Sequence, residues 1–299
     1  MKLTGTVTAL VTPFINQRLD EEGLARNISY QMEQGIDGLF LLGTTGESST
    51  LSQEEQSRII SIGVKEANKK VPVWVGTGSY CTRQTIDKTK RAKDLGADVA
   101  LIVTPYYNKP TQEGIYRHFE TIAASVKMPI VVYNIPGRCG TNIETSTLLR
   151  IAGLPNIIGV KESSGNVSQA GDVLDTVVKK YPHFSVFSGD DALTLPMMAL
   201  GAAGVVSVVS NLVPTQVIGQ VNAALQGRFD LARKLHYQLL PLYKTAFIET
   251  NPVPIKTAMG LCGMPAGKCR LPLYQMAPQN KKILRQLLLQ MQLIQPKIS

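Results

Sequence analysis

One lysine of the sequence has the surroundings expected of a chemically active amine. Lys161 follows the apolar residues Ile157, Ile158 and Val160, whereas nearly every other lysine lies in a polar stretch. An ammonium group at the end of an apolar strand loses hydration, which disfavours its charged form and lowers its pKa. A lysine of this kind can attack a carbonyl carbon and form a Schiff base. The alternative is a buried ion pair with Glu162 or another carboxylate.

A tyrosine could supply the proton transfers that such an amine needs. Tyr133 ends the apolar run Ile130–Tyr133. Schiff-base formation needs a proton to be moved at one place, and a phenol can do this if its pKa of about 10 is lowered or if it belongs to a relay. The alternative is a core tyrosine whose hydroxyl is satisfied by hydrogen bonds. The residue alone does not decide between the two.

Two further segments could bind carboxylate groups. Residues Gly43, Thr44, Thr45 and Gly46 form a small-residue segment whose backbone N–H groups and hydroxyls could bind an anion. Glycine and threonine also make ordinary strand-to-helix turns. Arg138 could hold a second carboxylate through two parallel hydrogen bonds, or it could be an exposed loop arginine.

Short apolar runs alternate with longer amphipathic segments along most of the chain. The apolar runs predict strands at Val7–Val11, Gly38–Leu42, Val71–Gly76, Val99–Thr104, Ile130–Tyr133, Ile157–Lys161, Ser185–Ser188 and Gly204–Val208. Helices are predicted between them, for example at Glu22–Gln34, Gln53–Asn68, Thr82–Leu95 and Gln112–Val126. Ser52 and Thr82 are placed where N-caps are expected.

Eight such units predict an α/β fold of the (β/α)8 TIM-barrel type. A doubly wound sheet is disfavoured because no G-x-G-x-x-G follows the first strand, and the segment 263–269 lacks P-loop spacing. After the eighth unit we expect helices at Asp230–Phe247, around Pro254–Leu261 and at Asn280–Gln292. The prediction is therefore a barrel domain of residues 1–225 and a C-terminal helical domain of residues 226–299.

Composition excludes several classes of protein. The four cysteines and three histidines form no C-x-x-C or zinc pattern, so we expect reduced thiols and no metal. No signal peptide begins the sequence, and the apolar stretch Met197–Val209 is shorter than the roughly 20 residues that span a bilayer. A cytoplasmic protein without membrane contact is expected. The net charge of +9 is spread over many helical segments, which argues against a nucleic-acid partner.

Together these segments resemble the dihydrodipicolinate synthase family, now called the 4-hydroxy-tetrahydrodipicolinate synthase family, within the pyruvate-dependent class I aldolases. The resemblance covers nearly the whole chain. Its motifs are G-T-T-G-E at 43–47, T-P-Y-Y at 104–107, Y-N-I-P-G-R at 133–138, G-V-K-E at 159–162, S-G-D-D at 188–191 and N-P-V-P-I-K at 251–256. Their order and spacing make the joint signal far more specific than any one motif.

The resemblance implies a lyase that holds pyruvate as a Schiff base on Lys161 and needs no cofactor. It would condense pyruvate with L-aspartate-4-semialdehyde to (4S)-4-hydroxy-2,3,4,5-tetrahydrodipicolinate, on the route to diaminopimelate and lysine. Tyr133 would be the general acid and base, and Thr44 would link it to Tyr107 in a proton relay. Because the matching tyrosine crosses a dimer interface in the family, a homotetramer built as a dimer of dimers is expected.

The resemblance also implies substrate-binding roles for Thr45, Arg138, Gly189 and Val206. Thr45 and Val206 would contact pyruvate, and Arg138 would bind the carboxylate of aspartate semialdehyde. Sialic-acid lyases lack an arginine at this position, which favours the synthase over N-acetylneuraminate or 2-keto-3-deoxy sugar acid lyase. A non-catalytic barrel that binds a keto acid is a second alternative, but a sensor needs neither Lys161 nor Tyr133.

A regulatory lysine site of the family is degenerate in this sequence. In the family this site is lined by His and Glu side chains. The matching positions here are Gln53, Gln56 and Gln84, with Ser48, Ser49, Tyr80 and Tyr106 nearby. A missing carboxylate at position 84 removes a charge-assisted hydrogen bond to a lysine ammonium, worth roughly 1.5–3 kcal/mol. Weak or absent feedback by lysine is therefore expected.

Overall fold

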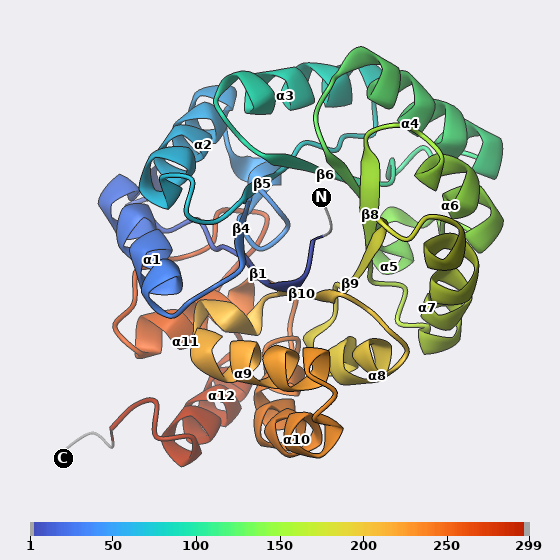
Figure 1. Cartoon of the computed structure of the whole chain (residues 1–299). Coiled ribbons are helices and arrows are strands. Elements are labelled where there is room, and N and C mark those ends of the chain that lie inside the picture. The colour runs from blue at the N-terminus through green and yellow to red at the C-terminus, as the bar shows by residue number, and fades with distance from the viewer. Residues whose placement is uncertain (1–2, 296–299) are drawn as a thin grey trace.

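A computed structural model describes residues 3–295 and shows a closed barrel of eight parallel strands (Figure 1). The order around the barrel is β1-β10-β9-β8-β7-β6-β5-β4. The strands are β1 Gly5–Ala9, β4 Gly38–Leu41, β5 Val73–Gly76, β6 Val99–Val103, β7 Ile130–Asn134, β8 Ile157–Glu162, β9 Ser185–Ser188 and β10 Gly204–Ser207. All eight predicted strands are confirmed, with ends that differ by at most two residues. The (β/α)8 barrel predicted from the sequence is confirmed.

Helices surround the barrel, as Figure 1 shows. They are α1 Glu21–Glu33, α2 Gln53–Ala67, α3 Thr82–Asp94, α4 Gln112–Ser125, α5 Pro136–Cys139, α6 Thr145–Ala152, α7 Val167–Val173, α8 Thr194–Ala199 and α9 Pro214–Leu225. Ser52 is the predicted N-cap of α2 and forms a capping box with Glu55. The prediction for Thr82 was wrong, because Cys81 is the N-cap position and Thr82 Oγ1 instead pairs with His118 Nδ1 at 2.9 Å.

A short hairpin beside the barrel was not predicted. It joins β2 Phe14–Ile15 to β3 Arg18–Leu19 through Asn16 and Gln17. Both turn residues have positive φ, as a two-residue hairpin turn of this type requires. Strands of two residues are too short to produce a period-two pattern in the sequence, so the alternation of side chains could not reveal them.

The barrel interior is filled by side chains rather than left open. Val7, Phe40, Trp74, Phe187 and Val206 belong to one buried interior cluster, in which the Trp74 and Phe187 rings meet edge to face at 5.3 Å. A second and larger apolar cluster lies between the strands and the surrounding helices. Since the interior is packed, substrates must bind at the C-terminal ends of the strands.

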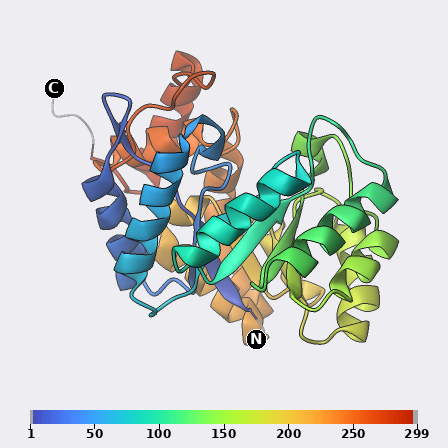
Figure 2. The same cartoon turned by 90° about the horizontal axis from the view of Figure 1, so that it is seen from above.

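Three helices follow the barrel, as predicted: α10 Phe229–Thr245, α11 Val253–Leu261 and α12 Pro278–Gln290. Figures 1 and 2 place this extension, orange to red, on one side of the barrel. Tyr243 of α10 donates a hydrogen bond to Gln220 Oε1 of α9 at 2.7 Å. Leu239 and Leu284 of the extension belong to the same apolar cluster as the barrel helices. We propose that the predicted domain of residues 226–299 folds, as far as residue 295, as an extension of the barrel domain predicted for residues 1–225. Residues 1–2 and 296–299 of these two domains lie outside the described residues.

No helix in the part of the chain that is described has the length and apolar character needed to cross a bilayer.

Candidate active site

Lys161 and Tyr133 come from neighbouring strands and lie together. They are direct register partners of β8 and β7. Lys161 Nζ lies 4.2 Å from the centroid of the Tyr133 ring and 5.4 Å from that of Phe40. Lys161 is only 5% exposed and Tyr133 only 7%. The structure therefore brings together the two side chains that the sequence selected for Schiff-base chemistry.

Burial lowers the pKa of Lys161 to about 7, and Arg138 contributes in the same direction, while Asp191 opposes the change. An amine with this pKa is neutral in about half of the molecules at pH 7, whereas an ordinary lysine is almost wholly protonated. Lys161 is thus available as a nucleophile at neutral pH.

The alternative of an ion pair with Glu162 is excluded. Glu162 accepts hydrogen bonds from Asn134 Nδ2 at 3.0 Å, Gln169 Nε2 at 3.2 Å and the Ser164 N–H at 2.6 Å. Successive strand residues point to opposite faces, so Glu162 points away from Lys161. Lys161 takes part in none of the ion pairs within residues 3–295.

The phenol of Tyr133 is a proton donor rather than a base at neutral pH. Burial raises its pKa to about 12, and Ser163 and Arg138 partly oppose this increase. Thr44 lines the same cavity as Tyr133. No hydrogen bond joins the two hydroxyls in the described chain, and the relay that the resemblance implies stays a prediction.

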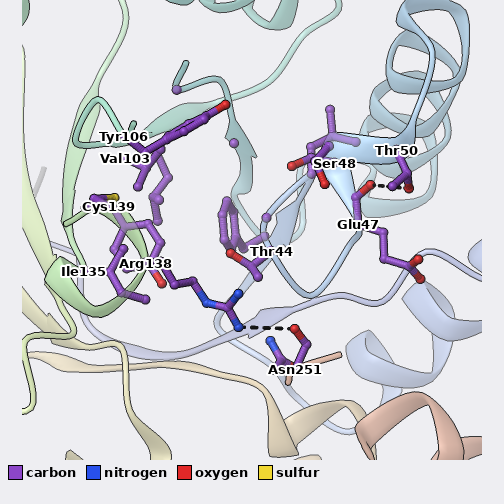
Figure 3. Close-up of a pocket in the computed structure, with 18 of the residues that line it drawn as sticks. Thr44, Glu47, Ser48, Thr50, Val103, Tyr106, Ile135, Arg138, Cys139 and Asn251 are labelled. Atoms are coloured by element: carbon purple, nitrogen blue, oxygen red, sulfur yellow. Dashed lines mark hydrogen bonds between the residues drawn. The ribbon is translucent and has the colours of Figure 1, made fainter. Parts of the chain in front are cut away.

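A cavity of about 360 Å³ opens beside Tyr133 and Phe40. Lys161 borders it through these two rings and is not itself part of its wall. Figure 3 shows its labelled residues, with Arg138 of α5 extending toward Thr44 and Asn251. The wall also contains Ser48, Ser49, Gln56, Lys88 and Tyr106. The cavity thus joins the expected catalytic region to part of the degenerate lysine site.

Asn251 links two predicted substrate-binding residues. Its backbone carbonyl accepts a hydrogen bond from Arg138 Nη2 at 3.3 Å, and its Nδ2 donates to Thr45 Oγ1 at 3.0 Å. Asn251 lies in the loop between α10 and α11, so the extension contributes to the site. The N-P-V-P-I-K motif contains Asn251, but sequence reasoning assigned it no role.

Two motifs of the sequence meet in a buried ion pair. Lys256 Nζ lies 2.6 Å from Glu47 Oε1, and the two side chains are 2% and 0% exposed. Lys256 also donates to the Thr12 carbonyl at 2.9 Å, while Glu47 Oε2 accepts from the Arg270 N–H at 2.8 Å. This cluster fixes the turn that follows Thr44 against the extension.

Gly189 and Val206 have steric roles in the structure. A Cβ on residue 189 would lie 1.8 Å from Ser163 Oγ and 2.8 Å from Lys161 Cε, so a larger residue would force one of these side chains to move. Val206 is 1% exposed within the barrel interior.

Asp191 is a residue of the site that sequence reasoning missed. It is 2% exposed and accepts hydrogen bonds from Ser207 Oγ at 2.5 Å and from the Val208 N–H at 2.9 Å. The S-G-D-D motif contains it, but nothing in the local sequence separates its role from that of Asp190.

Tyr107 is not brought to the site within one chain. Its side chain is 91% exposed and its backbone has φ 75°, an uncommon conformation outside glycine. The preceding residue, Tyr106, lines the cavity and contacts Tyr80 edge to face at 5.6 Å. Tyr107 is therefore no part of the cavity wall within the described chain.

Only some residues of the predicted lysine site line the cavity. Ser48, Ser49, Gln56 and Tyr106 line the cavity, whereas Gln53, Tyr80 and Gln84 are exposed outside its wall. Gln84 Oε1 accepts a hydrogen bond from Ser79 Oγ at 2.8 Å. Lys88 adds a cation to the wall that the sequence analysis did not include.

The described residues contain no group of three or more His, Cys, Asp or Glu side chains that could hold a metal ion. The four cysteines are free.

Known proteins share both the sequence and the fold. The model of the dihydrodipicolinate synthetase family matches residues 2–291. The 4-hydroxy-tetrahydrodipicolinate synthase of Protochlamydia amoebophila is 55% identical over 289 residues, 96% of each chain. A solved dihydrodipicolinate synthase from Thermotoga maritima has a TM-score of 0.97 at 40% identity, covering 98% of this chain and 100% of that one. Another, described as the first monomeric dihydrodipicolinate synthase variant, has a TM-score of 0.96 at 40% identity and covers 98% of both chains. This chain belongs to the dihydrodipicolinate synthetase family.

Proposed function

We propose that this chain condenses pyruvate with L-aspartate-4-semialdehyde to (4S)-4-hydroxy-2,3,4,5-tetrahydrodipicolinate, in the biosynthesis of diaminopimelate and lysine. The observation that carries this proposal is a buried amine with a pKa of about 7 beside the phenol of Tyr133, at a cavity whose wall includes Arg138. The family and its close relatives, which are named for this reaction, support it.

The first half of the reaction uses Lys161 and Tyr133. The neutral amine of Lys161 adds to the C2 carbonyl carbon of pyruvate, and the oxygen leaves as water, giving a protonated imine. Tyr133 enters protonated and donates one proton to the departing oxygen. The resulting phenolate then removes a proton from C3 of the bound pyruvate, which gives a nucleophilic enamine.

The second half uses the groups that bind carboxylates. The Thr44–Thr45 turn binds the pyruvate carboxylate, with Thr45 oriented by Asn251 Nδ2. Arg138 binds the carboxylate of aspartate semialdehyde, so that its aldehyde carbon faces the enamine. As the enamine carbon attacks the aldehyde carbon, the aldehyde oxygen takes from Tyr133 the proton removed from C3 and becomes the 4-hydroxyl group. The amino group of the added substrate then attacks the imine carbon and passes a proton to Lys161 Nζ, and the lysine amine leaves as the ring closes.

We propose that the active form is a homotetramer made of two dimers, in which Tyr107 of one chain reaches the site of its neighbour. The 91% exposure of this large aromatic side chain supports an interface there. That one solved relative is described as the first monomeric variant also supports assembly as the usual state of these enzymes. Native mass spectrometry measures the oligomeric state. Y107A is expected to lower the condensation rate. A wild-type chain that is monomeric and fully active would contradict both the tetramer and the role of Tyr107.

The cytoplasmic location remains a prediction.

The Schiff base is tested by reducing the protein with borohydride in the presence of pyruvate, followed by peptide mass mapping. A pyruvate adduct is expected on the Lys161 peptide and is expected to disappear in K161A. K88A is the matched control, because Lys88 lines the same cavity and its removal should leave the adduct in place. Labelling of K161A at the wild-type level would overturn the mechanism.

Assays of pyruvate with aspartate semialdehyde and of pyruvate with N-acetylmannosamine separate the synthase from a sugar acid lyase. Turnover is expected with aspartate semialdehyde.

A further inference from the structure

Ser163 has a hydroxyl group that is left without a partner inside the site. Its Oγ is shielded from solvent and makes no hydrogen bond within residues 3–295. Buried polar atoms are nearly always paired, so an unpaired one calls for an explanation. The adjacent Ser164 differs, because its Oγ accepts a hydrogen bond from the Asn166 N–H at 3.1 Å.

The backbone fixes this hydroxyl beside Lys161. Ser163 lies two residues beyond Lys161 at the end of β8, so the two side chains project to the same face. The Ser163 N–H donates to the Asn134 carbonyl at 2.8 Å, which continues the ladder between β8 and β7. The Gly189 N–H donates to the Glu162 carbonyl at 2.8 Å, which continues the ladder between β8 and β9. The hydroxyl is therefore held as firmly as a strand residue.

Gly189 leaves room for the hydroxyl next to the lysine chain. A Cβ at this position would overlap Ser163 Oγ, at 1.8 Å, and would lie 2.8 Å from Lys161 Cε. Ser163 also approaches the phenol of Tyr133, and a weak side-chain hydrogen bond between them opposes the rise of the Tyr133 pKa that burial causes. The hydroxyl thus borders both groups of the proposed reaction, makes no hydrogen bond to Lys161, and interacts with the phenol of Tyr133 too loosely to be satisfied by it.

We propose that Ser163 Oγ donates a hydrogen bond to the C2 oxygen of pyruvate while Lys161 forms the imine. This inference rests on the Schiff-base reaction proposed above and adds a third group to it. As the bond from Nζ to C2 forms, the electron pair of the carbonyl bond moves to this oxygen. A fixed donor at the place where negative charge develops stabilises that step.

The protons and electrons of the step balance. The oxygen takes one proton from the amine nitrogen and becomes the hydroxyl of the carbinolamine. It takes a second proton from the phenol of Tyr133 and leaves as water, with the electron pair of the C–O bond. The lone pair of nitrogen forms the C=N bond. Ser163 keeps its own proton throughout, so it acts by binding the oxygen and not as an acid.

Exchange of ¹⁸O from the C2 position of labelled pyruvate measures this step without the aldehyde, because each cycle of imine formation and hydrolysis replaces the oxygen. K161A gives the uncatalysed background. S163A is expected to lower the catalysed exchange rate about tenfold, since one hydrogen bond to a developing charge is lost. S163C, close in size but a weak donor, is expected to lose nearly as much. S163T keeps the hydroxyl and is expected to recover the rate, and S164A is expected to match the wild type.

The exchange rates of these variants decide whether Ser163 binds the C2 oxygen. Thermal melting checks that each variant is folded. Wild-type exchange in folded S163A or S163C overturns the role of Ser163 and leaves the Schiff-base mechanism standing. An equal loss in S163A, S163C and S163T assigns the effect to packing and also overturns it. Wild-type exchange no faster than that of K161A removes the imine chemistry itself, and the role of Ser163 falls with it.

Discussion

Lys161 and Asp191 are buried ionisable side chains of opposite charge within one site. Burial lowers the pKa of Lys161 to about 7 and raises that of Asp191 to about 6, so both are pushed toward their neutral forms. Asp191 is kept from a larger increase by hydrogen bonds from Ser207 and from the Val208 N–H. Its negative charge in turn favours the ammonium form of Lys161. The reactivity of the amine is therefore a balance between desolvation, which the charge of Arg138 reinforces, and the carboxylate of Asp191.

The rate of imine formation with pyruvate is expected to rise with pH and to level off above about 7, because only the neutral amine of Lys161 attacks. D191N removes the charge that favours the ammonium, so the midpoint is expected to move to lower pH. Initial trapping rates at saturating pyruvate, measured across neutral pH, give both midpoints. D175N, which neutralises an exposed aspartate, is the control. An unchanged midpoint in D191N would contradict the assignment.

G189A is expected to reduce the condensation rate on the order of a hundredfold, because a misplacement of about 1 Å in a site has such an effect. The added Cβ would force Ser163 or Lys161 to move. Steady-state kinetics measure the loss. G260A is the matched control, because a Cβ at Gly260 in α11 meets no atom within 4 Å. Normal turnover in G189A would contradict the prediction, because Ser163 and Lys161 would then have moved aside without loss of activity.

At the level of elements, the extension is part of the site. The loop between α10 and α11 contacts Arg138 and Thr45 through Asn251. Helix α11 then supplies Lys256, which pairs with Glu47 behind the Thr44–Thr45 turn. The extension thereby holds the carboxylate-binding turn and the arginine in one arrangement.

K256M is expected to lower the free energy of unfolding by about 3–5 kcal/mol, because it leaves the charge of Glu47 buried without its partner. The double variant E47Q/K256M is expected to recover much of this loss, since no buried charge is then unpaired. Urea unfolding measures both. R233A breaks the exposed pair of Arg233 with Asp230 and is expected to cost under about 1 kcal/mol. An equal cost for K256M and R233A would contradict the predicted effect of burial.

At the level of the whole molecule, one cavity runs from Tyr133 to the surface around Ser48 and Tyr106. Its wall carries the cations Lys88 and Arg138, while its one carboxylate, Glu47, is already paired. Such a wall repels a lysine ligand, which adds to the loss of a carboxylate at position 84.

L-lysine is expected to show no binding at micromolar concentration in isothermal titration calorimetry and no inhibition of condensation in that range. The physical reason is that its ammonium finds no free carboxylate and meets the charge of Lys88. The variant Q84E/K88L, which adds a carboxylate and removes the cation, is expected to bind lysine more tightly than the wild type. Micromolar binding to the wild-type chain would refute the prediction.

The sequence by itself determined the barrel fold and the pairing of Lys161 with Tyr133. Apolar runs alternating with amphipathic segments reflect burial on both faces of parallel strands, and such a pattern is local. Consecutive strands of a barrel are neighbours, so Lys161 and Tyr133, at the ends of β8 and β7, had to meet. The N-cap of α3 and the β2–β3 hairpin were not predicted, because short polar segments carry weak local signals.

Only the tertiary structure decided which groups surround that pair. Lys256 and Glu47 are 209 residues apart, and Asn251 and Thr45 are 206 apart, so no local period could connect them. The pKa values of Lys161 and Asp191 likewise depend on how completely distant segments exclude water. Desolvation and charge–charge interaction are properties of three-dimensional packing, whereas propensity and periodicity belong to the chain, which is why the sequence could name the amine but not the groups that tune and hold it.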